Sequence, residues 1–331
     1  PDGAGFAGIG VGTAGQVDAE TGSIRFASDL LPGYTGTKVK QELEETFGVP
    51  VYVDNDVNVL ALTELKLGAG RGAKHLICLA LGTGVGGAIV VDGRIVHGAW
   101  GGAAELGHLS VDFNGLPCVC GGVGCLEQYA SGTGIAKRMN MKLAANGVPG
   151  QHKPVTYEDR NLVETVQAKD GNPDLVEMDL AEAEDRDPVE AVQAKDGDRD
   201  PVEAVQAENG PRNSDNTVQA KVESGGESQV ATIDAKQVIS LWQEGDTLAT
   251  EVMEETFAAL GAAIASIAHL FNPEVVVIGG GVAEAGEPIF ERVREEAKKR
   301  GMKSFVEDLR IVPAFQGNWS GMIGAALQVW E

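Results

Sequence analysis

The amino-acid sequence predicts an α/β protein of two domains, and three observations support this. Short apolar runs, such as Glu274 to Ile278, indicate buried strands, and they alternate along the chain with longer stretches of helical pattern. The length of 331 residues is enough to bury two hydrophobic cores. Finally, polar or glycine-rich stretches follow directly after several strands, which is where ligands bind in open α/β sheets.

The composition argues against several classes of protein. Hydrophobic residues make up 43% of the chain, and no stretch reaches the ~18–20 apolar residues of a membrane span. The net charge of −23 repels the phosphates of nucleic acids and of anionic membranes. No signal-peptide pattern precedes Phe6, and the clustered cysteines do not resemble a disulfide framework, so we expect a cytoplasmic protein.

The first strand is expected within residues 6–15, where an apolar run enters a glycine turn. Three glycines of this run match the dinucleotide-binding fingerprint by letter (Gly10, Gly12 and Gly15). The fingerprint requires a helix next, but residues 16–22 indicate a turn-rich loop, which argues against a Rossmann domain. An amphipathic helix is expected over residues 37–47, with Val39, Leu43 and Phe47 on its apolar face.

A short strand over residues 50–54 leads into an Asn55–Asp56 pair and then a helix over residues 57–67. Side chains just past the carboxyl end of a strand are well placed to meet a ligand. The alternative is a helix N-cap, because Asn and Asp are preferred cap residues. The residues by themselves leave both interpretations open.

A second glycine loop, Gly82 to Gly87, follows a strand over residues 75–81. The next segment contains Asp92–Gly93, a hairpin signal, so the loop joins two antiparallel strands. Backbone amides of such a loop can approach phosphate oxygens closely, because glycine has no side chain. The alternative is a glycine hairpin that binds nothing. Cys78 lies inside the strand and is expected in the core.

Three cysteines and one histidine are spaced as H-x9-C-x-C-x4-C, at His108, Cys118, Cys120 and Cys125. Thiolates and imidazole are the ligands that structural Zn²⁺ takes, four at a time. The alternative is a group of free or buried thiols. Two carboxylates, Glu105 and Glu127, flank the cluster, so a metal here would shape a loop while the carboxylates bind a ligand.

Residues 151–230 differ in kind from the rest of the chain. A Val-Gln-Ala motif recurs at Val166, Val192, Val205 and Val218, which indicates a tandem 13-residue expansion. The segment holds 20 of the 49 acidic residues and has no Trp, Phe or Cys. It buries too little apolar surface to offset its ordering entropy, so we expect a disordered acidic insertion in a surface loop.

The remainder of the chain is expected to alternate helices and strands. Helices are expected over residues 128–140, 234–242, 246–271, 288–300 and 319–330, and strands over residues 274–278 and 310–314. A third glycine stretch, Gly279, Gly280 and Gly281, follows the first of these two strands. His269 lies on an apolar helix face and is expected to be structural.

Glu105-x-Gly-His108, followed by Cys118-x-Cys120-Gly-x-x-Gly-Cys125-Leu-Glu127, resembles the signature of the ROK family of sugar kinases and sugar-responsive repressors. The resemblance implies a two-domain actin-like ATPase (ribonuclease H-like) fold. Residues 1–56, completed by 315–331, would be the small domain, and residues 57–314 the large one. It further implies a homodimer or homotetramer.

The resemblance also assigns roles to residues. Asp56 would be the catalytic base, and Asn55, Glu105, His108 and Glu127 would bind the sugar. The first phosphate-binding set would comprise Gly82, Thr83, Gly84, Gly86 and Gly87. The third glycine stretch, Gly279 to Gly281, would face the adenosine. The implied reaction uses ATP and Mg²⁺ to phosphorylate a hexose, with glucose favoured over N-acetylmannosamine, fructose or allose, and with polyphosphate as the alternative donor.

One departure from the family is that no Asp-x-Gly-Gly-Thr phosphate loop occurs in residues 1–331. We therefore expect that the sequence lacks an N-terminal segment and that the chain as it stands is inactive. The remaining small-domain sheet would have two parallel strands, near Gly8 and Val51. The alternatives are a sugar-binding pseudokinase and a sugar-responsive transcriptional regulator.

Overall fold

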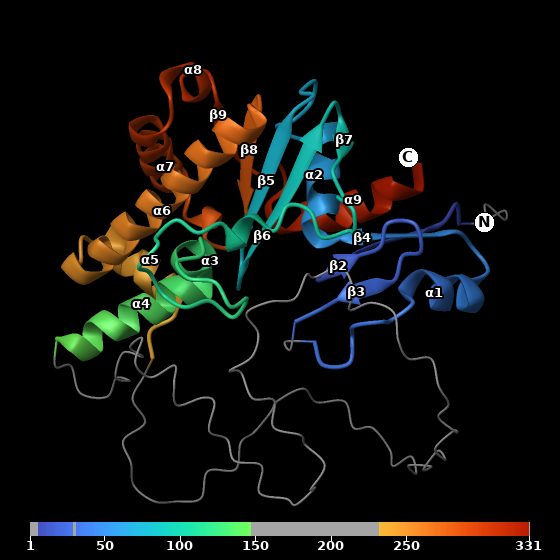
Figure 1. Cartoon of the computed structure of the whole chain (residues 1–331), viewed down its shortest axis with the longest axis horizontal. Coiled ribbons are helices and arrows are strands. Elements are labelled where there is room, and N and C mark those ends of the chain that lie inside the picture. The colour runs from blue at the N-terminus through green and yellow to red at the C-terminus, as the bar shows by residue number, and fades with distance from the viewer. Residues whose placement is uncertain (1–5, 29–30, 147–231, 331) are drawn as a thin grey trace, which may run out of the picture. The chain divides into compact units, whose positions relative to one another are not determined.

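The computed structural model describes residues 6–28, 31–146 and 232–330 (Figure 1). All of them belong to one compact unit of the chain, which spans residues 1–154 and 229–331. The predicted acidic insertion at residues 151–230 lies outside the described residues. Within the described residues, no helix is both long and apolar enough to cross a membrane.

The larger sheet has five strands in the order β7-β6-β5-β8-β9. Their bounds are β5 Leu76–Leu81, β6 Val85–Val91, β7 Arg94–Ile95, β8 Val275–Gly279 and β9 Arg310–Pro313. The first three strands are antiparallel neighbours, whereas β8 and β9 run parallel to β5. The predicted Asp92–Gly93 turn is present, and both residues have the positive φ that a tight hairpin requires.

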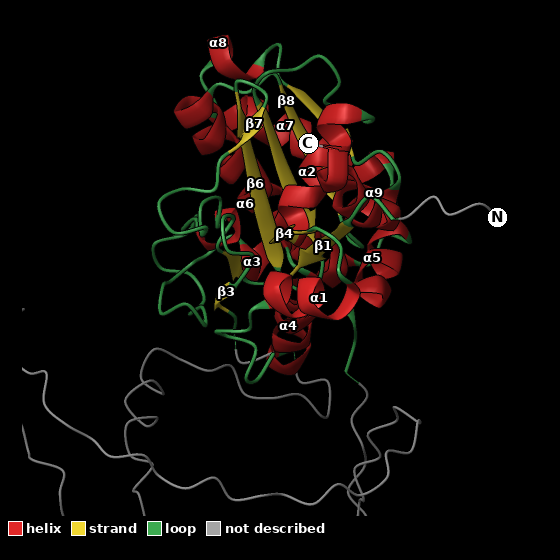
Figure 2. Cartoon of the chain, turned by 90° about the vertical axis from the view of Figure 1, so that its right-hand side faces the viewer, coloured by secondary structure: helices red, strands yellow, loops and turns green. Residues whose placement is uncertain are grey.

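Helices cover both faces of this sheet (Figure 2). On one face, α6 (Thr247–Phe271) and α7 (Glu287–Arg300) pack with Ile77, Leu79 and Leu81 of β5. On the other face, α2 (Asp56–Lys66) packs against Leu76 and Cys78. Alternate residues of β5 therefore enter two separate cores, which explains why the strand is apolar throughout. Cys78 is fully buried, as predicted.

The smaller sheet pairs β1 (Ile9–Thr13) with β4 (Val51–Asn55) in parallel, as the sequence predicted. A hairpin of β2 (Gln16–Val17) and β3 (Ile24–Phe26) occupies the stretch expected to be a loop. Helix α1 (Val39–Phe47) has Val39 and Leu43 packed against this core. The expectation for Phe47 was wrong, because its side chain is 60% exposed.

The remaining elements connect these layers. They are η1 (Leu106–His108), α3 (Glu127–Ala130), α4 (Gly132–Ala145), α5 (Ala235–Gln243), η3 (Ala283–Ala285), α8 (Lys303–Val306), η4 (Gly317–Trp319), α9 (Ser320–Leu327) and η5 (Gln328–Trp330). One helix was expected over residues 128–140, but Ser131 interrupts it and separates α3 from α4. Ser131 is extended, and its hydroxyl accepts a hydrogen bond from Gly134 N, so it caps α4.

Helix α9 packs closely against both β1 and α2, and glycines make this approach possible. A Cβ on Gly10 would lie 1.6 Å from the carbonyl oxygen of Ala325, and a Cβ on Gly324 would lie 1.6 Å from that of Val59. Thr63 of α2 also donates a hydrogen bond to Ser320 O at 2.6 Å. These contacts fix α2, whose first residue is Asp56, against the smaller sheet.

We expect Gly324→Ala to lower the free energy of unfolding by about 1–3 kcal/mol, because the added methyl collides with backbone that cannot move aside. Gly321→Ala is the matched control. Gly321 lies on the same helix with no atom near its Cβ position, and alanine favours helix over glycine by roughly 1 kcal/mol. Chemical denaturation of the two variants measures both values. Equal stabilities would contradict the close packing of α9.

Candidate active site

Asn55 caps α2, so the capping interpretation of this residue is confirmed. Its side-chain oxygen accepts hydrogen bonds from Val57 N at 2.9 Å and from Asn58 N at 3.4 Å. Its amide nitrogen donates to Gly15 O at 3.1 Å. An amide nitrogen carries two hydrogens, so one donor remains for a ligand. Capping and ligand binding are thus compatible at this residue.

Asp56 is the first residue of α2, and its side chain is exposed to solvent. Its carboxylate accepts a hydrogen bond from Val57 N at 3.0 Å. The surrounding protein nevertheless raises the pKa of Asp56 by desolvation, and the negative charge of Glu105 raises it further. The carboxylate is therefore open to a ligand while standing in an environment that strengthens it as a proton acceptor.

Glu105 precedes η1 and is also exposed. Gln16 donates a hydrogen bond to its carboxylate at 3.3 Å. The segment that carries Glu105 packs tightly on β6. A Cβ on Gly87 would lie 2.4 Å from Ala104 O, and a Cβ on Gly107 would lie 2.1 Å from Val85 O. Any side chain at either position would push this segment away from the sheet.

The other face of β6 contacts the start of α2. A Cβ on Gly86 would lie 2.5 Å from Val57, the residue after Asp56. Adjacent strand residues point to opposite faces of a sheet. The missing side chains of Gly86 and Gly87 therefore let α2 pack on one face of β6 and the segment of Glu105 pack on the other. The structure shows close packing at these two glycines, whereas the sequence predicted phosphate contact. Contact with phosphate stays a prediction for both.

At the tip of the glycine loop, Gly82 and Thr83 are exposed and Gly84 is half-buried, and hydrogen bonds to α4 anchor the loop. Gly132 N donates to Gly82 O at 2.8 Å, and the Thr133 hydroxyl donates to Thr83 O at 2.7 Å. The amides of Thr83 and Gly84 have no hydrogen-bond acceptor in the part of the chain that the structure describes. A loop that is anchored through its carbonyls and leaves amides available is suited to bind an anion.

Glu127 connects the cysteine segment to this loop. It opens α3, and its Oε2 accepts a hydrogen bond from Val85 N at 3.0 Å. A Cβ on Gly84 would lie 2.5 Å from the same oxygen. A carboxylate has further acceptor positions, so Glu127 can hold the glycine loop and accept a hydrogen bond from a ligand as well.

The third glycine stretch lies beside the second, although residues 88–278 separate them in sequence. Strands β5 and β8 are parallel neighbours, so Gly82 and Gly280 leave the sheet at the same edge. Val282 N donates to Leu81 O at 3.1 Å, and Gly280 has a φ of 89°. No atom of the described residues lies within 4 Å of the Cβ position of Gly281, which leaves space on that side.

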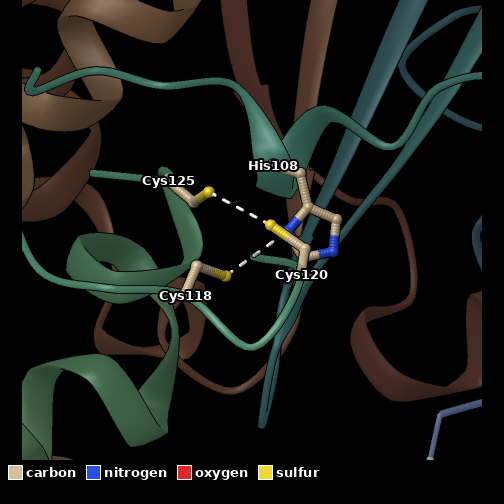
Figure 3. Close-up of side chains that lie close together, drawn as sticks. All are labelled: His108, Cys118, Cys120 and Cys125. Carbon is tan, nitrogen blue, oxygen red and sulfur yellow. Dashed lines mark hydrogen bonds between the residues drawn. The ribbon is translucent and has the colours of Figure 1, made fainter. Parts of the chain in front are cut away.

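The histidine and the three cysteines meet at one point (Figure 3). Their ligand atoms all lie within 4.8 Å of one another. His108 Nδ1 is 3.6 Å from Cys118 Sγ, and Cys120 Sγ is 3.6 Å from Cys125 Sγ. Four ligands around one Zn²⁺ at about 2.0–2.3 Å place neighbouring ligand atoms roughly 3.3–3.8 Å apart. The residues therefore fit a tetrahedral zinc ion in number and chemistry, and these two pairs fit it in spacing.

The loop of the cluster is built so that the sulfurs face inward. Gly121 and Gly124 have positive φ, and a Cβ on Gly124 would lie 1.7 Å from Asp112 O. Gly122 N donates to Cys120 Sγ at 3.4 Å, which favours the thiolate form of that ligand. Since Nδ1 of His108 faces the sulfurs, Nε2 points away from them (Figure 3).

Comparison with known proteins identifies the family. The model of the ROK family matches residues 2–181 and 204–331. The chain belongs to the ROK family. It is 30% identical to a glucokinase of Thermotoga maritima over 323 residues, covering 98% of this chain and 79% of that protein. It is 33% identical to a glucokinase of Halalkalibacterium halodurans, covering 96% of this chain and 74% of that protein.

A solved structure of a ROK family glucokinase from Streptomyces griseus, in complex with glucose and AMPPNP, is similar in fold. The TM-score is 0.64 with 26% identity, over 96% of this chain and 79% of that one. The predicted actin-like ATPase fold is thereby confirmed. ROK repressors are related too, and the chain spans 58% of a xylose repressor at 25% identity.

Three contacts of side chains at this candidate site were not predicted from the sequence. Gln16 holds Glu105, Thr133 holds the glycine loop, and Asp54 pairs with His97 at 2.8 Å. Each acts across a long sequence separation through one hydrogen bond. A single polar residue carries no periodic pattern, so the sequence offered no signal for these pairings. The Asn55–Asp56 motif did point to the neighbourhood of Asp54.

Proposed function

We propose that this ROK protein is a hexose kinase that transfers the γ-phosphate of ATP to a hydroxyl group of glucose. The observation that carries the proposal is that three candidate parts of the site all contact β6. Gly86 touches α2 beside Asp56, Gly87 touches the segment of Glu105, and Val85 donates to Glu127. The candidate base, the candidate sugar ligands and the glycine loop are thereby assembled on one strand.

Asp56 is the proposed general base. Phosphoryl transfer needs the attacking hydroxyl to be positioned and to lose its proton as it bonds to phosphorus. A base of this kind contributes roughly 10²–10⁴-fold to the rate. The raised pKa of Asp56 brings the carboxylate closer to the working pH, which makes it a stronger proton acceptor than an ordinary surface aspartate.

The sugar is proposed to bind through acceptors and donors that surround Asp56. They are the second amide hydrogen of Asn55, the carboxylates of Glu105 and Glu127, and Nε2 of His108. Carboxylates form charge-assisted hydrogen bonds with hydroxyl groups, and adjacent hydroxyls of a pyranose suit several such acceptors. The glucokinase relatives support glucose as the substrate.

The nucleotide is proposed to bind at the common edge of β5 and β8. The amides of Thr83 and Gly84 would donate to phosphate oxygens, and Gly279 to Gly281 would face the adenosine. Mg²⁺ bridging the phosphates would neutralise charge that develops on them during transfer. The complex of the Streptomyces griseus relative with AMPPNP supports ATP as the donor.

The cysteine cluster is proposed to hold a structural Zn²⁺. Four protein ligands leave no position for a metal-bound water, so the ion takes no part in the chemistry. Cys125 and Glu127 are separated by one residue, so fixing the cluster fixes the carboxylate that holds the glycine loop. His108 would bind the ion through Nδ1 and offer Nε2 to the sugar.

The kinase proposal is tested with the protein expressed from its complete open reading frame. Asp56→Asn should lower kcat for glucose by roughly 10²–10⁴-fold and leave glucose affinity nearly unchanged, because the amide keeps the size but loses the proton acceptor. Glu105→Gln should mainly raise the KM for glucose, because it would contact a hydroxyl that does not react. Coupled-enzyme kinetics and calorimetry measure the two effects.

The stability of Asp56→Asn serves as its control. A carboxyl group whose folded pKa is raised weakens the fold at neutral pH, and this penalty disappears as the pH falls below the unfolded value near 3.8. The variant should therefore be at least as stable as the parent at pH 7. If Asp56→Asn retains most of its turnover, Asp56 is not the base. A parent protein that binds sugar without phosphorylating it would favour the regulator or pseudokinase.

Gly82→Ala tests the phosphate loop separately. No protein atom lies near the Cβ position of Gly82 and its φ is not positive, so the folded protein accommodates alanine. A phosphate lying against the loop would not, and we expect the KM for ATP to rise while the melting temperature stays unchanged. Gly281→Ala probes the adenosine side in the same way. An unchanged KM for ATP in both variants would place the nucleotide elsewhere.

Metal analysis tests the zinc proposal. We expect about one Zn²⁺ per chain after purification, and roughly none in Cys120→Ser grown in parallel, because a hydroxyl is a poor zinc ligand. Cys78→Ser is the matched control, since Cys78 lies in the core and away from the cluster. Zinc absent from parent protein grown with ample metal would rule the site out.

A further inference from the structure

One partly buried pair, between Asp54 and His97, joins the two segments that carry Asp56 and Glu105. Asp54 Oδ2 lies 2.8 Å from His97 Nε2, and Asp54 is only 8% exposed. Asp54 belongs to β4 and stands two residues before Asp56. His97 follows β7 and begins the segment that ends at Glu105. The proposed function gives neither side chain a role in binding or catalysis.

We propose that His97 is a positioning residue, which by pairing with Asp54 holds the segment of residues 97–105 in place and sets Glu105 opposite Asp56. The proposal rests on the proposed function of this site. It assigns His97 no contact with substrate. Its effect on the reaction runs through Glu105, which would bind a hydroxyl group of the sugar.

The Asp54 side of the pair is rigid. Its other oxygen, Oδ1, accepts hydrogen bonds from Asn55 N and from Asn58 Nδ2, both at 2.7 Å. The carboxylate is thus bound from the strand, from the helix and from His97. The Asp54 side chain, held by three hydrogen bonds, gives His97 a fixed partner. Asn55 and Asp56 follow Asp54 directly in the chain.

The His97 side of the pair organises the segment. Its carbonyl accepts a hydrogen bond from Ala103 N at 3.1 Å, which closes residues 97–103 into a loop. The loop lies against the β2–β3 hairpin, since a Cβ on Gly101 would be 1.9 Å from Val17 O. Ala104 then adopts a φ of 67°, and Glu105 follows. Movement of His97 would thus be passed on to Glu105 through a short, closed loop.

The electrostatics favour a charged pair. The hydrogen bond to Asp54 and its negative charge raise the pKa of His97, against the opposing effect of burial. Hydrogen bonds to ionised groups are the stronger ones, and partial burial limits screening by salt. The pair can therefore add to the contacts that hold a loop containing three glycines.

The test compares three variants of the complete protein. His97→Ala should raise the KM for glucose about tenfold and leave the KM for ATP unchanged, because a lost hydrogen bond to a charged group frees Glu105 and does not touch the glycine loop. His97→Gln should largely restore the parent KM, because its amide can still donate to Asp54. His75→Ala is the matched control, since His75 is similarly half-buried and lies 3.7 Å from Asp92, away from the site.

A double variant separates positioning from a general loss of structure. If His97 acts through Glu105, adding His97→Ala to Glu105→Gln should raise the KM for glucose little further. A full tenfold rise in the double variant, or an equal rise in the KM for ATP, overturns the proposal. So does His97→Gln behaving like His97→Ala.

Hydrogen exchange distinguishes failure of this inference from failure of the proposed function. Amides of residues 98–105 should exchange faster in His97→Ala than in the parent or in His97→Gln, whatever the substrate is. If the parent does not phosphorylate glucose, the proposed function is wrong and the exchange data alone judge the positioning claim. Unchanged exchange in His97→Ala overturns it.

Discussion

The candidate site depends on close packing against both faces of β6. Gly86 admits the start of α2 on one face, and Gly87 admits the segment before η1 on the other. Two such contacts at adjacent positions are possible only because neither residue has a side chain. The distance between the candidate base and the candidate sugar ligands is therefore set by this close packing on β6.

The cysteine cluster belongs to a segment that also packs on β6. It lies in the segment between Glu105 and Glu127, and both ends of that segment rest on β6, one through Gly87 and the other through the Val85 amide. A segment of this length that contains only the short η1 and two isolated β-bridges is costly to order by packing alone. Four ligand atoms converging on one point add to its order, so a metal here would act on the site through geometry.

Like charges gather at the site, which opposes folding. Desolvation raises the pKa of Asp56, and the negative charge of Glu105 adds to this effect, whereas the neighbouring Asp54 is compensated by His97. Unpaired carboxylates at the end of a strand are a common cost of function, because a ligand with many hydroxyl groups needs free acceptors. Asp54, in contrast, is buried, and its pairing with His97 offsets the cost of burying its charge.

The sequence by itself determined most of the element types, but not the β2–β3 hairpin. It also determined the hairpin at Asp92–Gly93, the two parallel strands of the smaller sheet and the four cluster residues, because periodicity, turn chemistry and ligand spacing are local properties. Only the tertiary structure decided that Gly86 and Gly87 serve packing, that Glu127 holds the glycine loop, that α4 begins anew after Ser131 and that Asp54 meets His97. Each of these depends on a contact between residues distant in the chain, and a single hydrogen bond or a missing Cβ leaves no pattern in the sequence that could reveal its partner.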